Sequence, residues 1–155
     1  LAMEDLLDLI SISTKLPASF PIIIIKEKYF KGMIWLNTMV YENDELSNFN
    51  DSANGIAPTY SELKRFEKKL GFKKQTLNPI KLNYHEKSGF VVFKDLNSHL
   101  IVDFGKVGPD YLPGHAHADT LSFELVIKGE RVIVNSGTSV YTKSEERQRQ
   151  RGTSA

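Results

Sequence analysis

The chain has 155 residues, of which 41% are hydrophobic and 25% are charged, and its formal net charge is +1. These proportions are ordinary for a globular protein, and so small a net charge gives no electrostatic case for binding nucleic acid or an anionic membrane. The absence of cysteine excludes disulfides, thiolate metal sites and cysteine nucleophiles. The apolar run FPIIII is far shorter than the roughly 20 residues that cross a bilayer.

The first half of the chain shows helical patterns. Apolar residues at helical spacing predict one helix over Ala2–Ser13 and a second over Ile24–Tyr41. Thr59 and Glu62 form the pattern of a capping box, which predicts the start of a third helix that ends at Gly71. The start of the chain lacks the basic region of a signal peptide and any helix-capping signal, so we expect a fragment of a longer protein.

The second half of the chain shows the two-residue period of β-strands. Residues 89–105 predict a hairpin with its turn at Asp95–Ser98, and residues 121–127 alternate like a half-buried antiparallel strand paired with 131–137. Before these strands lies a polar loop, Tyr41–Pro58, and ordered loops of this length tend to be functional.

The order of these elements defines the expected fold. Helices come first and strands follow, which predicts an α+β fold with a helical segment at 1–79 and an antiparallel β-sheet domain at 80–155. A sheet of this kind exposes strand edges, so a homo-oligomer is a further expectation.

The octapeptide PGHAHADT is the strongest candidate for a site. In a strand, His115 and His117 would project from one face, with Asp119 completing the row. Such a row suits either a metal ion or a general base beside an orienting group, and polar residues without a function are the alternative. The spacing to Glu124 differs from the cupin metal pattern, and Thr120 stands where a metallo-β-lactamase has histidine.

The run RQRQR places Arg147, Arg149 and Arg151 at alternate positions. In a strand these side chains would all face one side, which suits an anionic ligand. A solvated basic tail is the alternative interpretation.

The order of the motifs from Gly105 to Tyr141 resembles the heparinase II/III-like polysaccharide lyases. That family shows a pattern close to Y-x-PGHAHAD-x-LSFEL, followed by V-x-V-D/N-SGT-x-x-Y. The matching residues here are Tyr111, PGHAHAD at 113–119, LSFEL at 121–125, VIVNSGT at 132–138 and Tyr141. FNDSANGIAP at 49–58, followed by a capped helix, is similar to the end of the family's helical toroid.

The resemblance implies an incomplete (α/α) toroid followed by an antiparallel β-sandwich, of which this chain would hold the last toroid helices and part of the sandwich. It implies cleavage of uronic-acid-containing glycans, such as glycosaminoglycans, by β-elimination. An anionic polysaccharide is then the partner, and the periplasm or cell envelope is the expected location. The fragment itself is expected to be inactive, because no residue in 1–80 matches the toroid's catalytic positions.

The resemblance also implies roles for single residues. His115 would be an acid/base or substrate-binding group, and Tyr111 is a second catalytic candidate, with a packing aromatic as the alternative. Arg147 and Arg151 would bind the acidic sugar. Asp119 is assigned to substrate binding, with a hydrogen bond to a histidine or the backbone as the alternative.

Zinc is implied for some members of the family. His117 matches a zinc ligand, whereas Asn135 stands where those members have an aspartate ligand. Because an asparagine amide binds zinc less well than a carboxylate, no cofactor is assigned with certainty, and zinc stays an open alternative for the intact protein. Two other functions also stay open: a non-catalytic carbohydrate-binding or assembly module, and a small metal-dependent β-sandwich enzyme.

Overall fold

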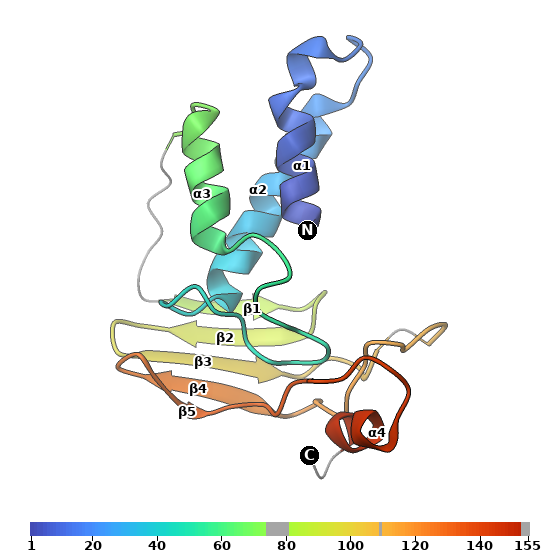
Figure 1. The fold of residues 1–155 in the computed structure, drawn as a ribbon. Helices are drawn as coiled ribbons and strands as arrows, with labels where there is room; N and C mark the ends of the chain where they lie inside the picture. The colour runs from blue at the N-terminus through green and yellow to red at the C-terminus, as the bar shows by residue number, and fades with distance from the viewer. Residues whose placement is uncertain (74–80, 109, 153–155) are drawn as a thin grey trace. The chain divides into compact units, whose positions relative to one another are not determined.

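The computed structural model describes residues 1–73, 81–108 and 110–152. The chain divides into two compact units, one of Leu1–Val40 with Gly55–Leu77 and the other of Tyr41–Asn54 with Asn78–Ala155. The first unit is helical and the second is built on an antiparallel sheet (Figure 1), so the predicted α+β class is confirmed. The predicted boundary at 79/80 falls outside the described residues.

The helical unit contains α1 (Ala2–Ser11), the short 3₁₀ helix η1 (Ser13–Lys15), α2 (Ile22–Met39) and α3 (Tyr60–Lys69). All three predicted helices are present, although α1 and α2 each end two residues earlier than predicted. The capping box of α3 is formed as predicted, with Thr59 and Glu62 each accepting the other's backbone N–H. None of the helices in the described part of the chain has the length and apolarity needed to span a membrane.

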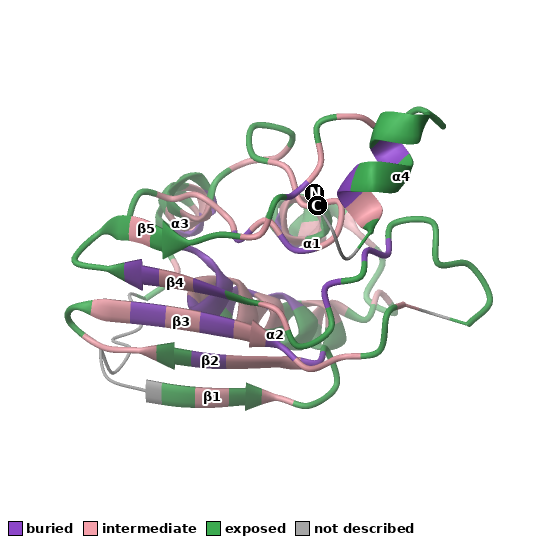
Figure 2. Cartoon of the chain, turned by 90° about the horizontal axis from the view of Figure 1, so that it is seen from below, coloured by how far each residue is buried: buried purple, intermediate pink, exposed green. Residues whose placement is uncertain are grey.

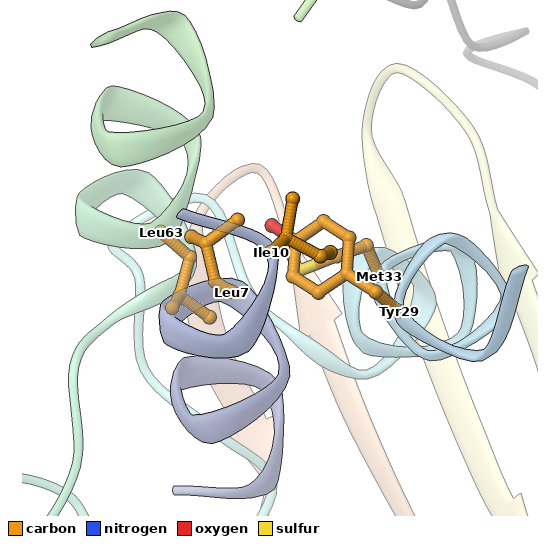
Figure 3. Close-up of a cluster of buried hydrophobic side chains, with 5 residues drawn as sticks. All are labelled: Leu7, Ile10, Tyr29, Met33 and Leu63. Carbon is orange, nitrogen blue, oxygen red and sulfur yellow. The ribbon is translucent and has the colours of Figure 1, made fainter. Parts of the chain in front are cut away.

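The helical unit has its own hydrophobic core (Figure 3). Its buried side chains come from all three helices and are those of Leu7, Ile10, Tyr29, Met33 and Leu63. The Tyr29 hydroxyl donates to the Glu67 carboxylate at 2.9 Å, so the polar atom that enters this core has a partner.

The second unit holds a five-stranded antiparallel sheet in the order β1-β2-β3-β4-β5. The strands are β1 (Lys81–His85), β2 (Phe90–Lys94), β3 (Ser98–Asp103), β4 (Phe123–Ile127) and β5 (Glu130–Ile133). The predicted hairpin is β2–β3 and the predicted strand pair is β4–β5, whereas β1 was not predicted. Figure 2 shows buried residues concentrated in β2, β3 and β4, in the middle of the sheet.

The two faces of the sheet differ in polarity. One face aligns Val92, Ile101 and Glu124 across three strands, and all three side chains are buried. The opposite face carries an apolar row that crosses the whole sheet: Leu82, Phe93, Leu100, Leu125 and Ile133. Part of this row is exposed. Apolar faces of this kind pack against a second sheet in β-sandwiches, which agrees with the partial sandwich predicted from the sequence.

Burial along β4 is the reverse of what its sequence pattern suggests. The polar row is buried, with Glu124 and Val126 inside, whereas Phe123 and Ile127 are exposed. The physical reason is that Glu124 is fully hydrogen-bonded by protein groups, which offsets the cost of burying its charge.

Two further segments differ from expectation. PGHAHADT does not form a strand but runs as a loop between β3 and β4. RQRQR is part of a helix, α4 (Glu145–Arg151), because Ser144 caps it by accepting the Arg147 N–H and acidic residues occupy its first turn. In the helix, Arg147 and Arg151 share one side, while Arg149 pairs with Glu146.

Candidate functional site

The segment Tyr41–Asn54 belongs to the sheet unit and is held there by buried carboxylates. Glu124 of β4 accepts a hydrogen bond from the Asn48 N–H at 2.8 Å. Asp119, in the loop of residues 113–120 that we call the histidine loop, accepts the Asn50 N–H at 2.5 Å. Hydrogen bonds to ionised groups are stronger than those between neutral groups, so these contacts fix the backbone of the segment.

Asp51, the next residue along this segment, is the centre of the candidate site. The Nδ1 atom of His115 and the Nε2 atom of His117 each lie 2.8 Å from one of its carboxylate oxygens. Arg147 of α4 binds both oxygens through two guanidinium nitrogens at 2.5 Å. Only 5% of the Asp51 side chain is exposed. We call these four residues the Asp51 cluster.

The ionisation of Asp51 determines how the two imidazoles are oriented. Burial alone would raise the pKa of this carboxyl, but the hydrogen bonds from Arg147, His115 and His117 outweigh burial and hold its pKa well below the usual range. An ionised carboxylate only accepts hydrogen bonds, so each ring nitrogen that faces it carries a proton. In a neutral His115 ring, Nε2 is then the basic nitrogen.

The two histidines have opposite environments. The His115 side chain is 85% exposed, whereas only 1% of the His117 side chain is exposed. The backbone N–H of His117 donates to the side-chain oxygen of Asn50, and its Nδ1 atom is buried without a partner among the described residues. His115 is therefore the one that can reach an external molecule, while His117 joins the loop to the segment that carries Asp51.

The two arginines predicted to bind substrate both contact the histidine loop. Arg151 donates from Nε to the Ala116 carbonyl at 2.7 Å and from Nη2 to the Pro113 carbonyl at 2.9 Å. Arg147 lies over Asp51 and donates weakly to the Gly114 carbonyl at 3.4 Å. Both side chains project from the same side of α4, so this helix holds in place the loop that presents His115.

Two tyrosines lie differently with respect to the Asp51 cluster. Tyr111 is 88% exposed and makes no hydrogen bond within the part of the chain that the structure describes. Tyr141 contacts the cluster instead: its hydroxyl donates to the backbone carbonyl of Asp51 at 2.8 Å. Its ring also lies 5.5 Å from the Arg147 guanidinium, within the range of a cation–π contact.

The positions implied as zinc ligands do not fit a metal in this structure. His117 uses Nε2 for Asp51, so Nδ1, which has no hydrogen-bond partner among the described residues, is its one nitrogen left for a metal, but Asn135 offers no free ligand atom beside it. The Asn135 amide nitrogen donates to Asp119 at 2.9 Å, and its oxygen accepts the Gly137 N–H, so both ends of the amide are in use. Within residues 1–73, 81–108 and 110–152, no three His, Cys, Asp or Glu side chains are grouped to hold a metal ion. Asp119 itself accepts from Asn135 and from the Asn50 backbone.

Sequence reasoning missed Asp51 and the contact of Tyr141 with it. The sequence places Asp51 only within the polar loop Tyr41–Pro58 and the stretch FNDSANGIAP, with no chemical role. Asp51 is 64 residues from His115 and 96 from Arg147, so no local spacing connects them. The sequence feature that pointed to this region was the length of the polar loop Tyr41–Pro58.

Comparison with known proteins places part of the chain in a family. Residues 79–155 match the family described as "Heparinase II/III-like, C-terminal". This part of the chain therefore belongs to the heparinase II/III-like family, as its sequence motifs indicated. No curated protein gave a significant match.

Two solved structures of heparinase III gene products are similar to the chain. One, with methylated lysines, has a TM-score of 0.66 and 20% identity, and the match covers 96% of this chain and 25% of that chain. The other has a TM-score of 0.54 and 21% identity over 80% of this chain and 22% of that chain. These identities indicate a shared fold, and the chain spans about a quarter of the length of these structures.

Proposed function

We propose that this chain supplies an acid–base group to a polysaccharide lyase that cleaves uronic-acid-containing glycans by β-elimination. The observation that carries the proposal is the hydrogen bond between the buried Asp51 carboxylate and Nδ1 of the exposed His115 ring. A carboxylate in this position sets the tautomer of the imidazole and stabilises its protonated form. Nε2 is then left to exchange a proton with a bound molecule.

The reaction requires the groups that this geometry offers. A base removes the C5 proton of the uronic acid, the electron pair forms the C4–C5 double bond, and the C4–O bond breaks. The oxygen of the leaving sugar then takes a proton. His115 would carry one of these two proton transfers, and a positioned general acid or base contributes typically ~10²- to 10⁴-fold to the rate.

Arg147 supports this role indirectly. Its guanidinium binds both oxygens of Asp51, so it is committed to the carboxylate that orients His115. An arginine engaged in this way through two parallel hydrogen bonds is a positioning residue rather than a ligand for the uronate. The positive charge that faces the substrate's carboxylate must therefore come from other side chains.

The proposal is tested by ultraviolet absorbance of the unsaturated uronate product, with the full-length protein and a panel of acidic glycans. We expect product with the unmodified protein and a loss of about 100-fold or more in rate for His115→Ala. His85→Ala, which removes an imidazole of β1 outside the Asp51 cluster, is the matched control and should retain the rate. Saturable glycan binding without product would instead identify a carbohydrate-binding module.

A further inference from the structure

A second feature lies beside the Asp51 cluster and has no role in the proton transfer. It is a cleft of ≈ 590 Å³ at one end of the sheet, between the β1–β2 turn and the segment that leaves β3. Figure 1 shows that β1 and β3 both end, and β2 begins, at this end of the sheet. The volume is within the range of ligand sites, roughly 300–1,000 Å³.

The cleft adjoins the histidine loop through two of its lining residues. Asn50 lines it and directly precedes Asp51 in the chain. Gly108 also lines it and packs against Ala116, the residue between the two histidines: a Cβ at Gly108 would lie 2.9 Å from the Cβ of Ala116. A ligand that fills the cleft would therefore lie next to the loop that presents His115.

The chemistry of the lining is that of an acidic sugar site. Lys87 and Lys106 line the cleft with exposed side chains, and neither has an ion pair within the described residues. Phe104, also in the lining, is stacked on Tyr84 with ring centroids 5.0 Å apart, so its ring is held in place. Glu86, which lies beside Lys87 in the β1–β2 turn, is an exposed acidic residue of the lining.

The buried carboxyl of Asp103 also lines the cleft. Burial raises its pKa, the charge of Asp119 acts in the same direction, and the hydrogen bond from the Gly105 N–H opposes them. The side-chain oxygens of a carboxyl in this position can accept hydrogen bonds from sugar hydroxyls.

We infer that this cleft binds one acidic sugar unit of the glycan next to His115, with Lys87 and Lys106 binding its carboxylate or sulfate group. The inference rests on the proposed function and deepens it, because it names the cations that Arg147 cannot supply. The lysine ammonium groups recognise the anion, Phe104 gives an apolar surface for the sugar ring, and Asp103 accepts hydrogen bonds from hydroxyls.

The experiment measures glycan binding by isothermal titration calorimetry with the full-length protein in a His115→Ala background, which prevents turnover. Three oligosaccharides of equal length serve as probes: an unsulfated uronate-containing one, a sulfated one and a neutral one. The double variant Lys87→Gln with Lys106→Gln removes both charges at nearly constant size. Lys143→Gln is the matched control, because Lys143 is exposed in the same unit but does not line the cleft.

We expect the double variant to bind acidic probes at least about tenfold more weakly, with Lys143→Gln unchanged, since charge-assisted hydrogen bonds are the stronger class. Preference for the sulfated or the unsulfated probe then identifies which anion the lysines hold. Equal affinity of the double variant and the control, or equal binding of the neutral probe, would overturn the inference. Cleavage by the protein with its natural His115, together with unchanged affinity of the double variant, would overturn the cleft proposal alone. Lysine-dependent binding without cleavage by that protein would overturn only the lyase proposal.

Discussion

Glu124 and Asp51 are two buried carboxylates of the sheet unit that differ in what they hold. Glu124 accepts hydrogen bonds from four protein groups, which are the Tyr41 hydroxyl, the Asn48 and Asn135 N–H groups and the Arg131 guanidinium. Asp51 is equally well satisfied, but one of its partners is the exposed ring of His115. A carboxylate with only inward-facing partners serves the fold, whereas one that orients an exposed imidazole serves a site as well.

The contrast leads to separable expectations for stability and activity. Changes at Glu124 should act through folding, because none of its contacts reaches His115. Changes at Asp51 should act on both folding and the orientation of the histidine. Changes at His115 should act on activity alone.

The largest effect on stability is expected for Glu124→Ala. It leaves Arg131 and the Tyr41 hydroxyl without their buried acceptor, and removing one partner of a buried ion pair costs about 3–5 kcal/mol. The free energy of unfolding should fall by that amount in chemical denaturation. Glu27→Ala is the control: it breaks an exposed pair with Lys31 and should leave the unfolding midpoint unchanged. Equal losses of unfolding free energy in the two variants would contradict the structural role of Glu124.

Asp51→Asn tests the other carboxylate at nearly constant size. It takes the countercharge from Arg147 and an acceptor from the two histidines, so we expect a loss of about 2–3 kcal/mol in unfolding free energy. Unlike Glu124→Ala, it should also lower the rate of the folded enzyme by ~10²-fold or more, because the His115 tautomer is no longer fixed. Nitrogen NMR of the His115 ring reports the tautomer directly. An unchanged tautomer in the variant would separate Asp51 from the chemistry.

The pH dependence of stability supplies a control for this variant. The pKa of Asp51 is lowered in the folded protein from an ordinary value of 3.8, so its contribution is complete above that value and is lost as the pH falls toward the folded pKa. Unfolding free energy of the unmodified protein should therefore decline more steeply below about pH 4 than that of Asp51→Asn. Parallel curves for the two proteins would contradict the lowered pKa.

Local features of the fold were predictable from the sequence, and long-range ones were not. The capping box of Thr59 and Glu62 and the β2–β3 hairpin depend on neighbouring residues, and the sequence predicted both. The Asp51 cluster depends on tertiary structure that joins residues up to 96 positions apart. The segment that forms α4 was interpreted as a strand or a solvated tail from its alternating charges alone. Ser144 and the acidic first turn are helix-start signals that could have predicted the helix.

The reversed burial of β4 shows the same limit at the level of one strand. Alternation in the sequence indicates two faces but not which of them the rest of the unit covers. Here the segment that contributes Tyr41 and Asn48 supplies hydrogen bonds to Glu124, so the polar row is buried. The site motif was found from the spacing of its histidines and from its resemblance to a family, yet the carboxylate that orients it lies in a different part of the chain.

A smaller effect is expected for Asn135→Asp, at the position where zinc-binding relatives were expected to have aspartate. The Asn135 amide donates to Asp119 at 2.9 Å, and a carboxylate there would repel Asp119 instead. Unfolding free energy at neutral pH should fall by about 1–3 kcal/mol and recover on acidification, when one carboxyl is protonated. Asn97→Asp, in the β2–β3 turn, is the matched control. Stabilisation of the unmodified protein by added zinc would contradict the hydrogen-bonding role of Asn135.

The smallest effect on stability is expected for His115→Ala, and comparison with His117→Ala at the same carboxylate gives the sharpest form of the contrast. His115→Ala should leave the unfolding free energy unchanged, because most of its side chain is in solvent. His117→Ala removes a buried ring that joins the loop to Asp51 and should cost about 1–3 kcal/mol. Denaturation curves of both variants, measured beside their rates, distinguish the roles. If His115→Ala unfolds as easily as His117→Ala, the exposed imidazole is part of the scaffold, and the lyase proposal loses its acid–base group.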